Sequence, residues 1–150
     1  MPFRRPPTSI AVIAVLIATL SMGVAHADGF RPARAREKLH LFVNHYRVDH
    51  GLHRLRETRG VDRTAQRHAV AMKNTRTLFH SSNMWTKLRG QHPRCWGENV
   101  GMGPSVWKVF KGWVHSSPHR ANMLGRRYRS AGIGVSYAHG YYWITMIYFG

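Results

Sequence analysis

The sequence predicts an α+β domain in which helices come first in the chain and a pair of strands comes last. Apolar residues recur at helical spacing over residues 39–46 and again over 106–114, so each segment has one apolar face. Residues 131–137 alternate in polarity, and residues 141–149 are rich in aromatic and β-branched side chains. Because an uncovered strand of that composition would aggregate, we expect helices over both faces of the sheet.

The elements follow in order from local signals. Residues 28–37 are polar and basic and are expected to form a short lead-in before the first helix. A second helix opens near Asp62, an acid suited to a helix N-terminus. Ser105 is a candidate N-cap for the third helix. Ser117, followed by proline, is a candidate N-cap for a short fourth helix.

Residues 74–104 are rich in Gly, Ser, Asn and Pro, which predicts a long irregular stretch. Such a stretch inside a compact domain is usually functional or disordered. This one carries Trp85, Trp96, His80 and Glu98, too much aromatic content for a disordered linker. We therefore expect it to contribute to a functional site.

The first 27 residues have the layout of a signal peptide. A basic pair precedes the apolar run 10–20, and residues 25–27 give a small-x-small cleavage site. An uncleaved anchor is the alternative, but the run is short for a span of roughly 20 residues. We expect export with cleavage, a secreted mature chain over residues 28–150, and no other segment that could cross a membrane.

The mature part keeps 21 of the 23 Lys and Arg residues and all six acids, a formal charge of +15. This charge predicts attraction to anionic surfaces or polymers outside the cell, with a merely solvated basic surface as the alternative. The basic residues are dispersed, which argues against specific nucleic-acid binding. Cys95 is the only cysteine, so no intramolecular disulfide is possible, and we expect a monomer with a buried thiol or, alternatively, a Cys95-linked dimer.

Several short motifs then point to a known family when taken together and in order. They are residues 41–47, Phe79-His80-Ser81, Gly97-Glu98-Asn99-Val100, residues 113–124 and residues 131–135. The chain resembles a short bacterial member of the CAP superfamily of cysteine-rich secretory, antigen 5 and pathogenesis-related proteins (the SCP domain). The resemblance covers residues 38–150. It implies a three-layer α–β–α sandwich with a central antiparallel sheet and an open cleft.

The resemblance also assigns the cleft residues. The family's two histidines correspond to His80 and His119, and its first glutamate to Glu98, whereas Ser116 stands where the second glutamate is expected. Two imidazoles and a carboxylate are sufficient for zinc or another divalent metal with an open fourth position, although the spacing alone is a weak signal. The alternatives are a hydrogen-bonded network and acid–base catalysis, with Glu98 and His119 as the candidate catalytic residues. Structural roles around the cleft are expected for Gly97, Asn99 and Trp113.

Three functions remain open at this point. The first is a non-catalytic extracellular binding domain for a lipid, a sterol or an anionic envelope polymer. The second is a metal-dependent, peptidase-like hydrolase that uses His80, His119 and Glu98. The third is an interaction module of the cell envelope. We expect the histidines outside the motifs, His68 among them, at the surface, and the five tryptophans mainly in the core or the cleft wall.

Overall fold

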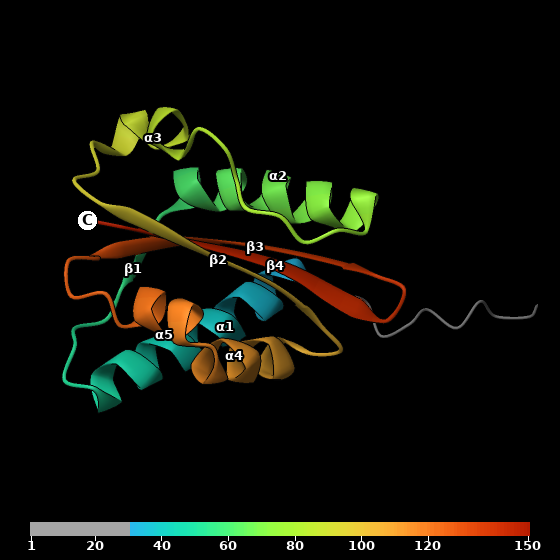
Figure 1. The fold of residues 1–150 in the computed structure, drawn as a ribbon, viewed down its shortest axis with the longest axis horizontal. Helices are drawn as coiled ribbons and strands as arrows, with labels where there is room; N and C mark the ends of the chain where they lie inside the picture. Colours follow the sequence, from blue (N-terminus) through green and yellow to red (C-terminus); the bar gives the residue numbers. More distant parts are fainter. Residues whose placement is uncertain (1–30) are drawn as a thin grey trace, which may run out of the picture.

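Three layers make up the part of the chain that the computed structural model describes, residues 31–150 (Figure 1). On one face of the sheet lie α1 (Pro32–Asp49), α4 (Val106–His115) and α5 (Ser117–Met123). On the other lie α2 (Arg59–Thr75) and α3 (Met84–Lys87). The predicted α–β–α sandwich is confirmed. The signal peptide predicted over residues 1–27 lies outside the described residues, and none of the described helices is long and apolar enough to span a membrane.

The sheet has the strand order β1-β3-β4-β2. Its strands are β1 (Arg56–Glu57), β2 (Trp96–Gly103), β3 (Ser130–Ala138) and β4 (Tyr141–Phe149). β3 and β4 form the predicted antiparallel hairpin, and β2 pairs antiparallel with β4. The two-residue β1 pairs parallel with β3, which makes the sheet mixed rather than wholly antiparallel. The three long strands thus form the expected antiparallel centre, with β2 at one edge.

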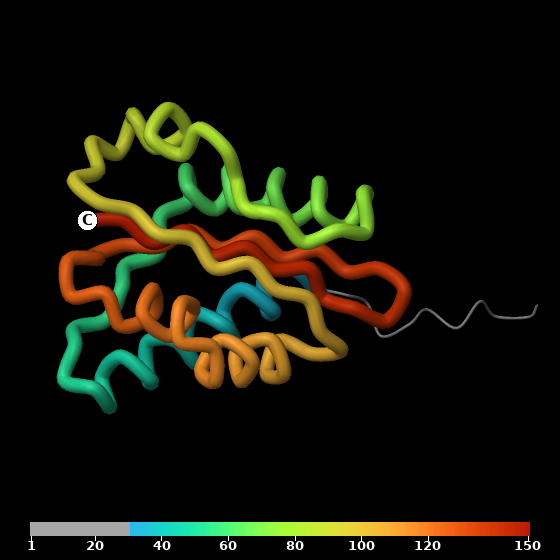
Figure 2. The backbone as a smooth tube through the Cα atoms, in the orientation of Figure 1, coloured from blue at the N-terminus to red at the C-terminus, as the bar shows by residue number. Residues whose placement is uncertain are grey.

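Two expectations about local structure are wrong. The supposedly irregular stretch 74–104 contains α3, the 3-10 turn η1 (Arg89–Gln91) and the whole of β2. In Figure 2 the chain can be followed from the end of α2 back beside β2 and then up to α3. The lead-in expected over residues 28–37 is helical from Pro32, because proline at the first helical position needs no hydrogen-bond partner for its nitrogen.

The sheet packs most closely against α2, where glycines replace side chains. A Cβ on Gly134 would overlap the carbonyl of Ala65, and one on Gly132 would overlap Val61. The helix backbone therefore lies almost directly on β3. The small inner residues of α2, Ala65 and Ala69, are fully buried, as this close approach requires.

Side chains of α2 also protect the edge of β3 beyond the short β1. The Ile133 N–H donates to Asp62 Oδ1 (2.8 Å), and the Val135 N–H donates to Gln66 Oε1 (3.0 Å). Gln66 Nε2 in turn donates to the Val135 carbonyl (2.9 Å). Asp62 is therefore more than an acid at a helix N-terminus, since it satisfies a strand amide that has no neighbouring strand.

Polar side chains on α1 tie neighbouring loops together. Asn44 donates to the Leu55 carbonyl (3.1 Å) and accepts from the Leu55 N–H (2.8 Å). The fully buried Arg47 donates to the carbonyls of Met123 (2.7 Å) and Gly125 (3.1 Å) at the end of α5. Burial lowers the pKa of Arg47 from its usual value, yet these carbonyls satisfy the guanidinium. Arg47 thereby fixes α5 relative to α1.

Candidate functional site

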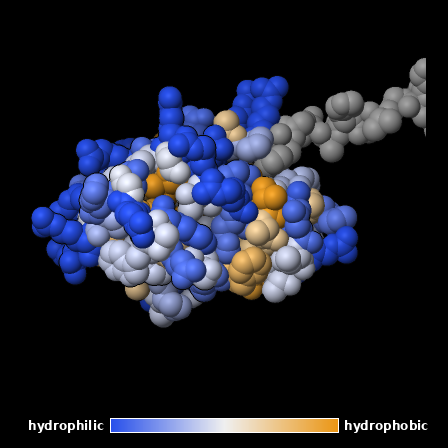
Figure 3. Space-filling view, turned by 90° about the horizontal axis from the view of Figure 1, so that it is seen from above, coloured by the Kyte–Doolittle hydropathy of each residue, from blue (hydrophilic) through white to orange (hydrophobic). Residues whose placement is uncertain are grey.

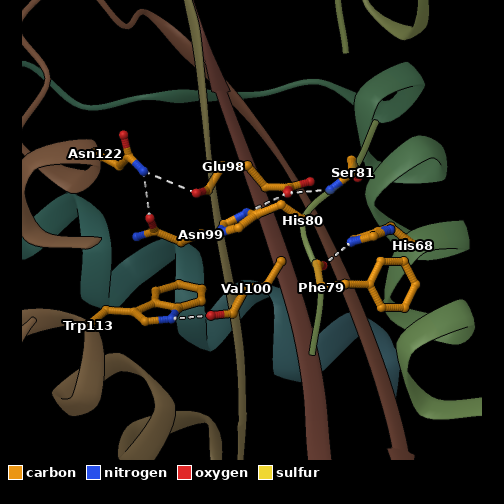
Figure 4. Close-up of polar contacts among 9 residues, drawn as sticks. All are labelled: His68, Phe79, His80, Ser81, Glu98, Asn99, Val100, Trp113 and Asn122. Carbon is orange, nitrogen blue, oxygen red and sulfur yellow. Dashed lines mark hydrogen bonds and ion pairs between the residues drawn. The ribbon is translucent and has the colours of Figure 1, made fainter. Parts of the chain in front are cut away.

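The candidate cleft lies at the edge strand β2, whose alternation sends successive side chains to opposite faces. In Figure 4 the Glu98 side chain points toward the segment that follows α2, whereas Asn99 points toward α5. Both residues are buried, with 4% of Glu98 and none of Asn99 exposed. β2 therefore connects the two halves of the site, one on each side of the sheet.

Glu98 holds the segment that carries His80. Its Oε1 accepts from the Ser81 N–H (2.8 Å) and lies 2.9 Å from His80 Nδ1. The His80 side chain is 64% exposed while that of Glu98 is 2% exposed, so the pair joins a solvent-facing imidazole to a buried acid. Glu98 Oε2 is buried and has no hydrogen-bond partner among residues 31–150. An unpaired buried carboxylate oxygen is costly, which marks this position as one suited to a further ligand.

His68, on α2, contacts the same segment and is buried, whereas the sequence predicted it at the surface. It is 7% exposed, and its Nε2 lies 2.7 Å from the Phe79 carbonyl (Figure 4). Its ring also packs edge-on against that of Phe79, with the ring centres 4.9 Å apart. These contacts hold Phe79, the residue that directly precedes His80, against α2.

Asn99 anchors α5 on the opposite face. Its Nδ2 donates to the His119 carbonyl (3.0 Å) and to the Tyr148 hydroxyl (3.2 Å). Asn122 Nδ2 donates to Asn99 Oδ1 (2.9 Å) and to the Glu98 carbonyl (3.0 Å), as Figure 4 shows. The sequence indicated a loop-tying amide at Asn99, but it gave no reason to choose Asn122, a polar residue between apolar ones in a short helix.

His119 sits at the start of α5, against the wall formed by Trp113. Its Nδ1 lies 2.7 Å from Ser116 Oγ, and its ring stacks on Trp113 with ring centres 6.3 Å apart. Burial lowers the pKa of His119 below its usual 6.5, and the nearby charge of His80 lowers it further. The ring is therefore held neutral near pH 7, and the two histidines are close enough to influence each other.

The expected N-cap of the short helix is displaced by one residue. Ser116, not Ser117, occupies the N-cap position, and α5 has no side-chain cap. The physical reason is that the Ser116 hydroxyl is engaged with the His119 ring. Ser105, in contrast, caps α4 as predicted, accepting from the Lys108 N–H (3.1 Å).

Gly97 and Trp113 have structural surroundings that explain their identities. A Cβ on Gly97 would collide with the Tyr128 hydroxyl and the Asn122 side chain. Trp113 is buried, and its Nε1 donates to the Val100 carbonyl (3.0 Å), which ties α4 to β2 (Figure 4).

The donor set can be tested against a divalent metal. Within residues 31–150, no group of three or more His, Cys, Asp or Glu side chains is placed to hold a metal ion. The Nδ1 atoms of His80 and His119 are engaged by Glu98 and Ser116, so their Nε2 atoms are the nitrogens that suit a metal. Glu98 then orients His80, as carboxylates commonly do behind a histidine ligand. The described side chains therefore leave these two imidazole nitrogens as candidate ligands and form no three-ligand site.

The arrangement of these side chains lacks one contact that catalysis by a serine nucleophile requires. Ser116 and His119 form a serine–histidine pair, but Glu98 lies on His80 and not on His119. A serine triad needs its acid on the histidine that activates the serine.

A second concave surface lies away from this cleft, between α1 and α4. It has a volume of about 350 Å³, and its walls include Phe42, Tyr46, Trp107 and Phe110. The ring centres of Phe42 and Trp107 are 5.1 Å apart, and those of Trp107 and Phe110 are 5.5 Å apart. Trp107 is 48% exposed, and Lys111 Nζ lies 5.7 Å above its ring. We call this surface the aromatic groove.

The α–β–α layers define the class of fold, and Glu98 on the edge strand β2 contacts His80. The sequence matches the cysteine-rich secretory protein family, CAP, over residues 41–148. The chain belongs to this family. No curated protein shows significant sequence similarity to it.

Solved structures share the fold at low sequence identity. An outer surface protein from Borrelia burgdorferi is 16% identical, with a TM-score of 0.69, over 78% of this chain and 92% of that protein. An extracellular SCP-domain protein from Bacillus anthracis is 21% identical, with a TM-score of 0.69, over 79% of this chain. The chain spans 41% of that protein's length. Venom allergen-like protein 4 from Schistosoma mansoni is 14% identical, with a TM-score of 0.60, over 75% of this chain and 86% of that one.

Proposed function

We propose that this chain is an extracellular binding domain that takes an amphiphilic lipid in the aromatic groove. Two of the similar structures are described as an outer surface protein and an extracellular protein, and residues 1–27 have the layout of an export signal. Both observations support a location outside the cytoplasm. The fold alone names no ligand, so the proposal rests on the surface.

The observation that carries the proposal is the groove's chemistry. Its volume of about 350 Å³ falls within the usual range of small-molecule pockets, roughly 300–1,000 Å³. The exposed ring of Trp107 and the partly buried rings of Phe42 and Tyr46 contribute apolar area. Lys111, His45 and Asp49 add polar groups at the same surface. An acyl chain packed on Trp107 and Phe42, with its acid group toward Lys111, would satisfy both. A sterol is the alternative occupant of the same class.

The test compares two exposed tryptophans. Trp107 lines the groove and is 48% exposed, whereas Trp85 lies on α3, in the opposite layer, and is 56% exposed. Trp107→Ala should weaken binding of a 16-carbon fatty acid about tenfold or more, measured by isothermal titration calorimetry. Such a loss corresponds to about 1.4 kcal/mol or more. Trp85→Ala should leave the affinity unchanged. Equal effects of the two substitutions, or no binding by the wild-type chain, would refute the proposal.

A metal-dependent hydrolase is the second candidate, favoured by the unpartnered Glu98 Oε2 beside His80. His80 and His119 would hold the ion through Nε2, and a bound divalent ion can polarise a carbonyl or lower the pKa of water. Elemental analysis of the native protein should find metal that the double variant His80→Ala/His119→Ala loses. The control is His92→Ala/His139→Ala, which removes two exposed histidines elsewhere. Metal absent from the wild type, or hydrolysis unchanged in the first variant, would exclude this candidate.

The third candidate, an envelope interaction module linked through Cys95, has a direct test. Cys95 is half-buried, and its Sγ lies 3.7 Å from the Gly150 carbonyl. A thiol in that position is poorly placed to meet a second chain, so we propose a monomer. Non-reducing electrophoresis of the exported protein should show a monomer band, and a reducible dimer would support the module instead.

A further inference from the structure

A row of arginines follows one face of α2, and none of them is in ion-pair contact with an acid among the described residues. Arg59, Arg63 and Arg67 are spaced four residues apart, so they share a face and succeed one another about 6 Å apart along the helix axis. Arg36, on α1, lines the same hollow, whose volume is about 760 Å³. Figure 3 views the α2 side of the molecule and shows mainly hydrophilic side chains there. We call the hollow the arginine pocket.

Two acids, the exposed Glu57 and the buried Asp62, also line the arginine pocket. Asp62 Oδ1 accepts from the Ile133 N–H (2.8 Å), which places this carboxylate against the edge of β3. Burial is the largest cause that raises the pKa of Asp62, and the charge of Glu57 adds to it, whereas the Ile133 N–H and the charge of Arg36 act in the opposite direction. Four arginines line the pocket against these two acids, so the pocket keeps an excess of positive charge.

None of the guanidinium groups lies within ion-pair distance of an acid in the described part of the chain. Among residues 31–150, the one pair of oppositely charged groups in ion-pair contact is His80 with Glu98, so none of the four arginines is paired. Arg36 Nε is buried and has no hydrogen-bond partner there. Like charges at four-residue spacing on a helix repel each other. Four clustered cations with an unsatisfied buried donor are the arrangement expected where an anion binds.

We propose that the arginine pocket binds phosphodiester groups of a polyol-phosphate polymer of the cell envelope. Guanidinium groups hold phosphate through paired N–H donors, and three of them in a row suit a ligand with successive phosphates. No aromatic ring is among the described residues that line the pocket, so it offers no platform for stacking bases. This favours a phosphate chain without bases over a nucleic acid. The site is separate from the aromatic groove and does not depend on lipid binding.

The probe is poly(glycerol phosphate) of defined length, titrated into the secreted chain at about 0.1 M salt, where charge effects beyond about 10 Å are screened. The triple variant Arg59→Gln/Arg63→Gln/Arg67→Gln should lose at least tenfold in affinity. The matched control, Arg94→Gln/Arg126→Gln/Arg127→Gln, removes the same charge from exposed sites elsewhere and should lose less than threefold. All six side chains are exposed, so both proteins should fold, which a thermal unfolding curve checks.

Several outcomes overturn the proposal. Equal losses of polymer affinity in the two triple variants would mean that net charge alone attracts the polymer. Absence of polymer binding by the wild-type chain would show that the arginine pocket is not a phosphate site. Oligothymidylate bound as tightly through the same arginines would indicate a nucleic acid. Phosphatidylglycerol vesicles that bind without competition from the soluble polymer would indicate a lipid surface.

Two further variants complete the test. Arg36→Gln should weaken polymer binding as well, because Arg36 closes the pocket from α1. Trp107→Ala should leave polymer affinity unchanged, and the α2 triple variant should leave fatty-acid affinity unchanged. These variants therefore distinguish a failure of the arginine pocket to bind the polymer from a failure of the aromatic groove to bind the lipid.

Discussion

Replacing Glu98 tests whether a buried carboxylate organises the cleft. Glu98→Ala leaves the Ser81 N–H without its acceptor and removes the charge beside His80. An unsatisfied buried donor costs about 1–3 kcal/mol, and the lost apolar side-chain atoms add about 0.8 kcal/mol per methylene. The His80 pair adds at most about 1 kcal/mol, because that imidazole is mostly exposed to water. We expect a total destabilisation of about 3 kcal/mol.

The assay is urea unfolding of four proteins: wild type, Glu98→Ala, Glu98→Gln and His80→Ala. Glu98→Gln keeps an oxygen for the Ser81 N–H and no longer buries a charge, so its free energy of unfolding should stay within about 1 kcal/mol of wild type. His80→Ala should cost less than about 1 kcal/mol. If His80→Ala is as destabilising as Glu98→Ala, the ion pair and not the backbone contact holds the segment, and the reasoning is refuted.

Three other predictions concern the sheet and the pH response. Gly134→Ala should cost about 3 kcal/mol in urea unfolding, because the added Cβ meets the Ala65 backbone, and an unchanged midpoint would contradict this packing. Asp62→Ala should lower the free energy of unfolding by about 1–3 kcal/mol, because the Ile133 N–H loses its acceptor. Asp62→Asn keeps an acceptor oxygen and should leave the free energy of unfolding nearly unchanged. Equal losses would show that the charge of Asp62 matters more than the hydrogen bond. Because the pKa of His119 is lowered in the folded state, the unfolded chain binds protons first, and stability falls as the pH drops below 6.5. His119→Gln should reduce the loss of stability between pH 7 and pH 5.5, and an equal loss in both proteins would contradict the assignment.

The sequence predicted the helices and the terminal hairpin because their apolar residues follow helical or alternating spacing. It failed at β2, whose glycines at positions 97, 101 and 103 suggested loops. Those glycines are needed because helix side chains lie directly on the strand: a Cβ on Gly101 would collide with Val109 and Trp113. In β2, the low strand propensity of glycine is outweighed by the packing of helix side chains against the strand.

The motifs singled out His80, Glu98, Ser116 and His119, but they did not show which of these residues contact one another. No local pattern shows that Glu98 contacts His80 while Ser116 contacts His119, because those partners are set by the alternation of β2 and the position of α5. The aromatic groove was not predicted from the sequence either. Trp107, expected in the core or cleft wall, is half-exposed because α4 turns it toward α1 at the surface.

The most direct measurement for the proposed function is to locate a bound fatty acid by nuclear magnetic resonance. A ¹³C-labelled 16-carbon acid is added to the protein, and intermolecular contacts are recorded to side-chain protons. Lipid binding in the aromatic groove predicts contacts between acyl protons and the rings of Phe42 and Trp107, with shifts at Lys111. Contacts to His80 and His119 instead, or no saturable contact at all, would contradict it.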